Sequence, residues 1–288
     1  AISIGEKPTL AISDPSASMR MAVAEALTNM AGVVIKGLNY VQVSANWMAP
    51  TGEIQEDSAL RKGVEALSKI CIDLKISVPV GKDSLSMKTK WKDGENEMQV
   101  ASPLSGVVSA MAPVDDVTIS ATPEIESDMD TSFLLIKLND ETRLSGSIFS
   151  EVTETSYTET PDVDNVDDFR TMFTFIQEMI SNHQILAIHD ISDGGLITTL
   201  LEMCFTKKIG MKINLPSSSN TNEQLFSEES GFVIQIKKDC VSSIINTFTE
   251  KGLIARELGS LQDNNFSIFK GDTELFKKSI IELSLIHI

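Results

Sequence analysis

The sequence predicts an α/β protein with mixed sheets, arranged as two lobes. Short apolar runs of strand-like character recur along the 288 residues, and segments with helical apolar spacing lie between them. An acidic, turn-rich stretch at residues 113–130 interrupts this pattern. We therefore expect an N-terminal lobe over residues 1–120 and a C-terminal lobe over residues 131–288. No short-period repeat is visible, which argues against a solenoid.

The chain is acidic, and its apolar fraction of 42% is large enough for a buried core. A formal net charge of -17 argues against a nucleic-acid backbone as partner, because such binding relies on lysine and arginine. This charge does not exclude a phosphorylated small molecule, which needs only local donors or a metal ion. No signal peptide and no apolar run of bilayer-spanning length is visible, so we expect no membrane partner and a cytoplasmic location.

Three cysteines, Cys71, Cys204 and Cys240, lie far apart in the sequence. Their odd number fits a reducing compartment, and their spacing gives no metal-site pattern. Cys71 and Cys204 fall in apolar helix patterns, where a thiol stays protonated. Cys240 opens a helix, which could lower its pKa, but no histidine is near it in the sequence. We therefore expect no glutamine hydrolysis by this chain.

The N-terminal lobe should contain two long helices among several strands. The expected elements are a strand at 9–12, a helix from Ser13 to about Ala31, a strand at 40–44, a helix at 57–74, a strand at 76–80, a turn at 92–96 and a strand at 98–111. Pro79 cannot donate a ladder hydrogen bond, so its strand should be an edge or a strand end. Residues 81–84, GKDS, follow it and suggest a phosphate or metal loop, with a solvated turn equally open.

The C-terminal lobe should alternate buried strands with helices. We expect strands at 133–138, 185–188, 211–215, 232–236, 254–258 and 266–269, with helices at 169–180, after residue 194, and at 241–250. Residues 151–168 have no apolar period, and we expect a surface loop or linker without a chemical role there.

The stretch that organises the chain is AIHDISDGGL at residues 187–196, which reads as strand, polar turn and helix. Asp190 and Asp193 can bind a hard cation through carboxylate oxygen, and Ser192 can donate to a phosphate. The two glycines that follow allow a close approach to ligand at the positive end of a helix. Aspartate and serine are also ordinary helix N-caps, so these residues alone leave a ligand site and a plain cap equally open.

A second candidate pair lies on the first long helix. Glu25 and Asn29 are four residues apart and therefore share one helix face. A carboxylate and an amide oxygen placed in this way can share one cation. From these two residues alone, an exposed polar pair is the favoured interpretation.

Several separated motifs together fit one family. They are AEALTN at 24–29, SANWM at 44–48, VPVGKDSLSMK at 78–88, HDISDGGL at 189–196 and FSEESG at 226–231. In this order they make the chain resemble formylglycinamide ribonucleotide (FGAR) amidotransferase, also called phosphoribosylformylglycinamidine synthase, in its large single-chain form. The synthetase domain of that family has two related halves, each similar to aminoimidazole ribonucleotide synthetase. The chain resembles most of the second half.

The resemblance implies a nucleotide-binding cleft between two α/β lobes. It implies that Glu25, Asn29 and Asp190 bind magnesium (Mg2+) and that Ser192 contacts ATP or ADP. It therefore reverses the interpretation of the Glu25 and Asn29 pair as merely exposed. A further magnesium-binding aspartate of the family would lie upstream of Ala1.

In this family, ATP phosphorylates the formamide oxygen of FGAR, and ammonia then displaces phosphate to give the amidine. A metal ion that bridges phosphate oxygens neutralises the developing charge, which explains a need for oxygen ligands. In the large form, the second half holds an auxiliary nucleotide, and turnover belongs mainly to the first half. The missing initiator methionine and the ending LIHI predict a partial chain, so the first synthetase half and the glutaminase domain are its expected partners.

Three hypotheses follow from these observations. The first is a piece of the purine-pathway ligase, and the second is a nucleotide-holding structural module without turnover. The third is a relative of the same architecture, such as selenophosphate synthetase or thiamine monophosphate kinase. The SANWM and GKDS stretches speak against the third.

Overall fold

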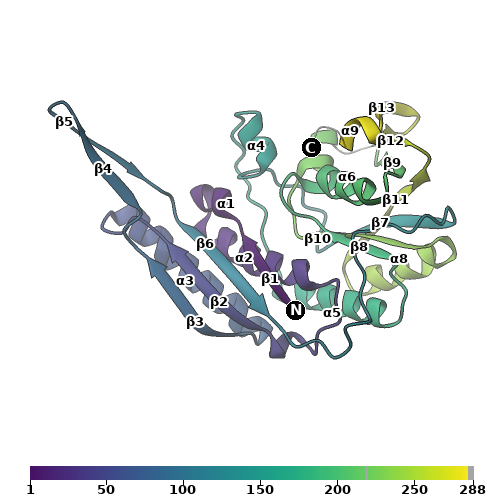
Figure 1. Cartoon of the computed structure of the whole chain (residues 1–288), viewed down its shortest axis with the longest axis horizontal. Helices are drawn as coiled ribbons and strands as arrows, with labels where there is room; N and C mark the ends of the chain where they lie inside the picture. Colours follow the sequence, from purple (N-terminus) through teal and green to yellow (C-terminus); the bar gives the residue numbers. More distant parts are fainter. Residues whose placement is uncertain (218–219, 285–288) are drawn as a thin grey trace.

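The computed structural model describes residues 1–217 and 220–284 (Figure 1). Two α/β lobes lie side by side, and each has its own main sheet. This arrangement confirms the predicted fold class. The end of the chain, LIHI, lies outside the described residues. Among the helices described, none is long and apolar enough to cross a membrane.

The N-terminal lobe is built on a four-stranded sheet in the order β1-β6-β2-β3. Its elements are β1 (Ile2–Glu6), α1 (Pro8–Ser13), α2 (Pro15–Met30), the 3₁₀ turn η1 (Leu38–Tyr40), β2 (Gln42–Met48), α3 (Ile54–Leu74), β3 (Ser77–Ser84), β4 (Lys88–Asp93), β5 (Asn96–Ala101) and β6 (Ser105–Met111). Strands β2 and β3 are parallel, whereas β6 pairs antiparallel with both β1 and β2. Strand β3 is an edge strand, as Pro79 predicts.

Helix α2 begins where the sequence predicts. The carboxylate of Asp14 accepts hydrogen bonds from the backbone N–H groups of Ser16 and Ala17, at 2.8 and 3.0 Å, and Pro15 fills the first turn. The helix packs against β1 and α3 and also contacts β8 (Ala187–Asp190) of the other lobe. It is therefore one of the elements that join the two lobes, as is α3, which contacts α5 (Val166–Ser181).

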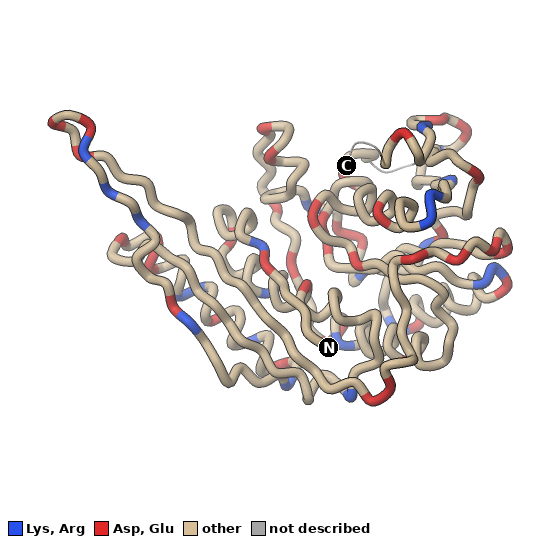
Figure 2. The backbone as a smooth tube through the Cα atoms, in the orientation of Figure 1, with Lys and Arg blue, Asp and Glu red and all other residues tan. Residues whose placement is uncertain are grey.

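Strands β4 and β5 form an antiparallel hairpin that projects away from the rest of the lobe, at the upper left of Figure 1. Its turn contains Gly94 in the left-handed region, with φ of 64°, which confirms the turn expected at 92–96. Figure 2 shows basic residues along β4 and acidic residues at the tip of the hairpin. Acidic residues also occur throughout both lobes in that view, in keeping with the net charge of -17.

The C-terminal lobe is built on a seven-stranded sheet in the order β13-β12-β9-β11-β7-β10-β8. Its elements are β7 (Thr131–Lys137), α4 (Ile148–Val152), α5 (Val166–Ser181), β8 (Ala187–Asp190), α6 (Gly195–Lys207), β9 (Gly210–Leu215), α7 (Thr221–Phe226), β10 (Gly231–Lys237), the 3₁₀ turn η2 (Lys238–Cys240), α8 (Val241–Glu250), β11 (Ile254–Gln262), β12 (Asn265–Lys270), β13 (Thr273–Ser279) and α9 (Ile280–Ser284). The pairings are antiparallel except for β9 with β12. All seven residues of β7 are buried, because the sheet is covered on both faces.

One hydrophobic core extends across both lobes. It includes Leu27 of α2 and Ile70 of α3 from one lobe, and Phe173 of α5 and Phe232 of β10 from the other. A second core lies under α6, on the opposite face of the seven-stranded sheet. The buried side chain of Gln177 strengthens the junction, since it bonds the backbone of residues 31, 33 and 35 in the loop after α2.

Three local expectations are wrong. Residues 9–12 belong to helix α1 and not to a strand, and the first strand is β1, which pairs with β6 more than a hundred residues away. Residues 81–84 continue strand β3 beside β2, so they do not form a loop. The strand expected at 98–111 is split into β5 and β6 by a break at residues 102–104.

The four-stranded sheet leaves one face uncovered, which we call the outer face. Its exposed apolar residues are Ile2, Ile4, Val80 and Met111, with exposed fractions of 77%, 55%, 58% and 43%. Register places them together, since Ile2 pairs with Met111 while Ile4 and Val80 lie in the next row. Such a patch of exposed apolar side chains is typical of an interaction surface.

Gly5 allows β1 to lie directly against α2. A Cβ at this position would be 2.1 Å from the carbonyl oxygen of Ala22 and 2.4 Å from the backbone nitrogen of Ala26. We expect Gly5→Ala to lower the free energy of unfolding by about 1–3 kcal/mol, because backbone must move to relieve the clash. Gly81→Ala is the control, since its nearest neighbour would be 3.5 Å away. Urea denaturation measures both, and equal midpoints would contradict the close approach.

Candidate functional site

The strand, turn and helix expected at 187–196 are present as β8, a turn and α6. The N-cap of α6 is Gly194, at φ of 81°, so neither Ser192 nor Asp193 occupies the N-cap position. The interpretation of Asp193 or Ser192 as an ordinary cap is therefore wrong. A Cβ on Gly195 would lie 2.7 Å from backbone atoms of Phe226 and Ser227. The glycine therefore allows close approach of the protein's own backbone at residues 226 and 227, and not of a ligand.

Asp190 lies at the end of β8 and is only 7% exposed. Its Oδ2 accepts a hydrogen bond of 2.9 Å from the Thr28 hydroxyl of α2, and its Oδ1 lies 3.3 Å from Nδ1 of His189. The other ring nitrogen of His189 is 3.0 Å from Glu202. Burial lowers the pKa of His189, but its bond to Asp190 and the two nearby carboxylates outweigh burial and raise the pKa overall.

Glu25 reaches the same turn from α2. Its Oε1 accepts a hydrogen bond of 2.5 Å from the Ser192 hydroxyl and lies 3.0 Å from the ammonium of Lys7. Its Oε2 accepts from the backbone N–H of Glu6 at 2.7 Å. Helix α2 and the turn after β8 thus meet through the hydrogen bond between Glu25 and Ser192, which are 167 residues apart in the sequence.

Asn29 lies one turn further along α2. Its side-chain nitrogen donates to the carbonyl oxygen of Ile4 at 2.9 Å, which leaves its amide oxygen for another partner. Asn29 and Asp190 both line a cavity of about 460 Å³ between α2, β8 and residues 120–123. Glu25 is not among the residues that line this cavity. Two of the three expected metal ligands therefore share a cavity, while Glu25 contacts Lys7 and Ser192 beside it.

The donor chemistry of these residues fits magnesium, which prefers carboxylate and amide oxygens. Asp190 and Glu25 supply carboxylates, and Asn29 supplies an amide oxygen, since its amide nitrogen is the atom that bonds Ile4. Within residues 1–217 and 220–284, no group of three or more His, Cys, Asp or Glu side chains is arranged to hold a metal ion. Shared coordination by Glu25, Asn29 and Asp190 is still a prediction.

Two charged residues that the sequence interpretation missed complete this region. Lys7 follows β1, is 3% exposed, and contacts Asp193 at 2.5 Å as well as Glu25. Burial lowers the pKa of Lys7, but the charges of Glu25 and Asp193 outweigh burial and raise it, so the ammonium is charged at neutral pH. Glu228 is 2% exposed, and its Oε1 accepts from the backbone N–H groups of Gly194 and Ile148, each at 2.9 Å.

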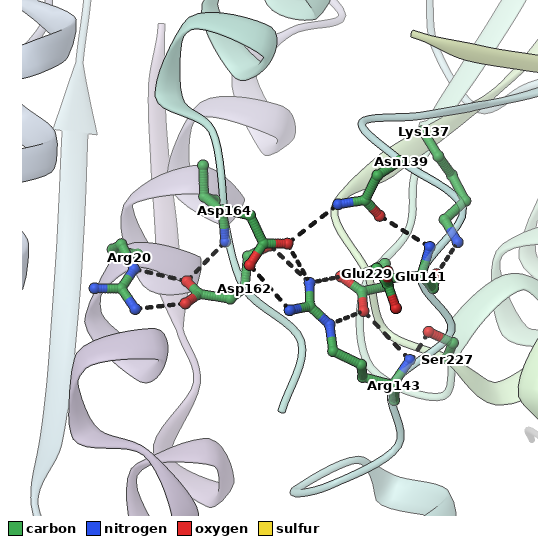
Figure 3. A network of polar contacts seen from close by, with 10 residues as sticks. Arg20, Lys137, Asn139, Glu141, Arg143, Asp162, Asp164, Ser227 and Glu229 are labelled. Atoms are coloured by element: carbon green, nitrogen blue, oxygen red, sulfur yellow. Dashed lines mark hydrogen bonds and ion pairs between the residues drawn. The ribbon is translucent and has the colours of Figure 1, made fainter. Parts of the chain in front are cut away.

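A second charge network continues from the neighbouring Glu229 (Figure 3). Arg143 donates to both carboxylate oxygens of Glu229, at 2.6 and 2.9 Å, and to Asp164 at 2.9 and 3.1 Å. Asp162 in turn accepts a bidentate contact from Arg20 of α2. Residues 151–168, expected to be a loop or linker without a chemical role, therefore bridge the two lobes through Asp162 and Asp164. Arg143 also fixes Glu229, the residue next to Glu228.

The cysteines lie outside this region. Burial raises the pKa of Cys71 to about 11 and also raises that of Cys204. The hydrogen bond of Cys240 to Asp239, at 3.3 Å, raises its pKa. The expectation that helix position could lower the pKa of Cys240 is therefore wrong.

Comparison with known proteins defines the class of this fold. The family model described as AIR synthase related protein, C-terminal domain, matches residues 133–270, and the one described as FGAR-AT PurM_N-like domain matches residues 1–113. The chain is thus a two-lobed protein of the AIR synthase-related class. Together with the match of the N-terminal lobe to the FGAR-AT model, this supports an FGAR-AT-like synthetase domain.

Solved structures show the same fold at low sequence identity. Thermotoga maritima PurL complexed with FGAR has a TM-score of 0.75 and 10% identity, over 99% of this chain and 45% of that chain. The same protein complexed with ATP gives a TM-score of 0.71, 10% identity, and coverage of 99% and 44%. Thiamine-monophosphate kinase from Stenotrophomonas maltophilia K279a gives 0.63, 11% identity, and coverage of 94% and 84%. The chain spans less than half of the PurL chains.

Replacement of Arg143 tests the charge network. Arg143→Met leaves the carboxylate of Glu229, whose side chain is 4% exposed, buried without its partner. We expect a loss of about 3–5 kcal/mol in the free energy of unfolding, because an uncompensated buried charge is costly. Arg61→Met is the matched control, since its pair with Glu65 is exposed and should cost no more than about 0.5 kcal/mol. Similar losses in chemical denaturation would contradict a structural role for the network.

Glu228 should make stability depend on pH. Burial raises its pKa above the ordinary value of 4.5, although Lys7 and the two backbone N–H groups act in the opposite direction. The folded state therefore holds this proton more tightly than the unfolded state, so its contribution to stability is lost as pH rises from 4.5 through the folded pKa.

In the variant Glu228→Gln this contribution is absent. We expect wild-type stability to fall relative to the variant as pH rises from about 4.5 towards neutrality. Free energies of unfolding measured across this range, with Glu95→Gln in the exposed hairpin turn as control, check the sign. Parallel curves for wild type and Glu228→Gln would contradict it.

Proposed function

We propose that this chain is most of the second half of an FGAR amidotransferase synthetase domain and that it holds an auxiliary magnesium nucleotide, ATP or ADP. The observation that carries this proposal is the meeting of Asn29 and Asp190 in one cavity, with Glu25 and Ser192 hydrogen-bonded beside it. The complete enzyme would convert FGAR, glutamine and ATP to formylglycinamidine ribonucleotide, in the cytoplasm.

The residues of the site would divide into metal ligands, a phosphate donor and a residue that orients a ligand. Asp190, Asn29 and Glu25 would hold magnesium, which when bound supplies positive charge that neutralises phosphate oxygens. The Ser192 hydroxyl, released from Glu25, would donate to a phosphate. Thr28 would keep Asp190 oriented, because its hydroxyl already donates to Oδ2 of that carboxylate.

Structural relatives support a nucleotide as the ligand. Among the matched structures, Thermotoga maritima PurL occurs in complexes with ATP, AMPPCP and ADP, as well as with FGAR. The thiamine-monophosphate kinase match shows that the fold also serves other reactions. The FGAR-AT model at residues 1–113 favours the synthetase over a kinase of this fold.

The rest of the synthetase would lie on the outer face. The chain spans 45% of the FGAR-bound PurL chain, so a first half of similar size is the partner that this proposal requires, together with a glutaminase domain. The exposed side chains Ile2, Ile4 and Val80 would be buried against that half. Ile4→Glu should therefore abolish co-purification of a co-expressed first half, while Ile12→Glu, also exposed but in α1, should not.

The proposed site is tested by Asp190→Asn. Loss of one charged, buried ligand should weaken binding of the magnesium nucleotide by roughly 1.5–3 kcal/mol, which is about tenfold or more in affinity. Calorimetric titration of MgADP measures the change. Asp93→Asn, at the exposed end of β4, is the control and should bind as wild type does. Equal affinities for both variants would count against the assignment.

A further inference from the structure

The ammonium of Lys7 occupies a central place among the acidic groups of the site. It lies 3.0 Å from Oε1 of Glu25, 2.5 Å from Oδ1 of Asp193 and 3.5 Å from the Ser192 hydroxyl. The Lys7 residue is 3% exposed and the side chain of Glu25 is 11% exposed. One positive charge therefore pairs with carboxylates from both lobes: that of Glu25 is shielded from water, whereas the side chain of Asp193 is 65% exposed.

The backbone of Lys7 is fixed while its side chain is long and flexible. The carbonyl oxygen of Lys7 accepts a hydrogen bond of 2.6 Å from Ser18, and the residue is the N-cap of α1. Its flexible four-carbon side chain carries a compact ammonium, which can bind phosphate oxygens as well as carboxylate oxygens. The end of the side chain is therefore the part that can change partner.

We propose that Lys7 is a resident counter-ion of the candidate metal site, which excludes a free divalent cation and gives way to a metal nucleotide. This inference rests on the proposed function, because it takes Glu25 as a metal ligand. A divalent cation on Oε1 of Glu25 and the ammonium of Lys7 cannot occupy adjacent positions, since like charges at this range repel strongly. Metal alone adds no new anion for the ammonium that leaves Glu25, which then retains only the exposed carboxylate of Asp193.

A nucleotide changes this balance because its phosphates accept the ammonium that leaves Glu25. The hydroxyl of Ser192, which shares the same carboxylate oxygen, becomes free in the same step. The site therefore discriminates between free Mg2+ and the magnesium complex of a nucleoside di- or triphosphate. Its ligand class is the metal–phosphate pair and not the metal alone.

The experiment compares binding of Mn2+, a probe for Mg2+, to the nucleotide-free 288-residue chain and its variants. We expect Lys7→Met to bind Mn2+ at least tenfold more tightly than wild type, because a competing cation is gone. Lys90→Met, which removes the same charge from exposed β4, should not change the affinity. The double variant Lys7→Met, Glu25→Gln should lose the gain, which places the metal on Glu25. Unchanged or weaker Mn2+ binding by folded Lys7→Met overturns the proposal.

A measurement on wild type covers the case in which Lys7→Met does not fold. The ammonium of Lys7, observed by NMR in protein with ¹⁵N-labelled lysine, should keep its resonance in millimolar Mg2+ and shift when MgADP binds. A shift with Mg2+ alone, or none on binding of MgADP, overturns the proposal. Failure of wild type to bind MgADP at all sinks the proposed function instead, and the comparison of Mn2+ affinities still decides whether Lys7 competes with a cation.

Discussion

The pairing of Lys7 with Glu25 and Asp193 is the interaction on which the lobe junction depends. Three separate parts of the chain meet there: the end of β1, the middle of α2 and the turn after β8. The carboxylate of Glu25 is withdrawn from water and needs a partner, and the lysine that serves it also pairs with the exposed Asp193 of the other lobe. The positions of Ser192 and Asp190 relative to α2 follow from this arrangement.

The prediction of secondary structure from the sequence was most successful where the local signal was strong. Asp14 and Pro15 correctly predicted the start of α2. The succession of apolar run, polar turn and helical pattern correctly predicted β8 and α6. It failed at residues 9–12, because a short apolar run is compatible with either a strand or a helix. It also failed at β1, whose pairing with β6 depends on residues that are distant in sequence.

The candidate site was foreseen only in part, for the same physical reason. Asp190 and Ser192 stand in a recognisable turn, whereas Lys7 carries no local pattern and a lysine is ordinarily expected at the surface. Its burial depends on partners such as Asp193, 186 residues away. Asp162 and Asp164 were overlooked because a loop rich in acidic residues usually faces solvent. In the structure, Asp162 pairs with Arg20 of one lobe and Asp164 with Arg143 of the other.

The core that runs through α2 has a consequence for how the protein comes apart. Leu27 and Phe173 belong to one continuous set of buried side chains, and Gln177 fastens α5 to the loop after α2. A break in the connection at residues 113–130 would leave each piece with a large uncovered apolar surface. Each lobe should therefore depend on the other for stability, and neither is suited to independent expression.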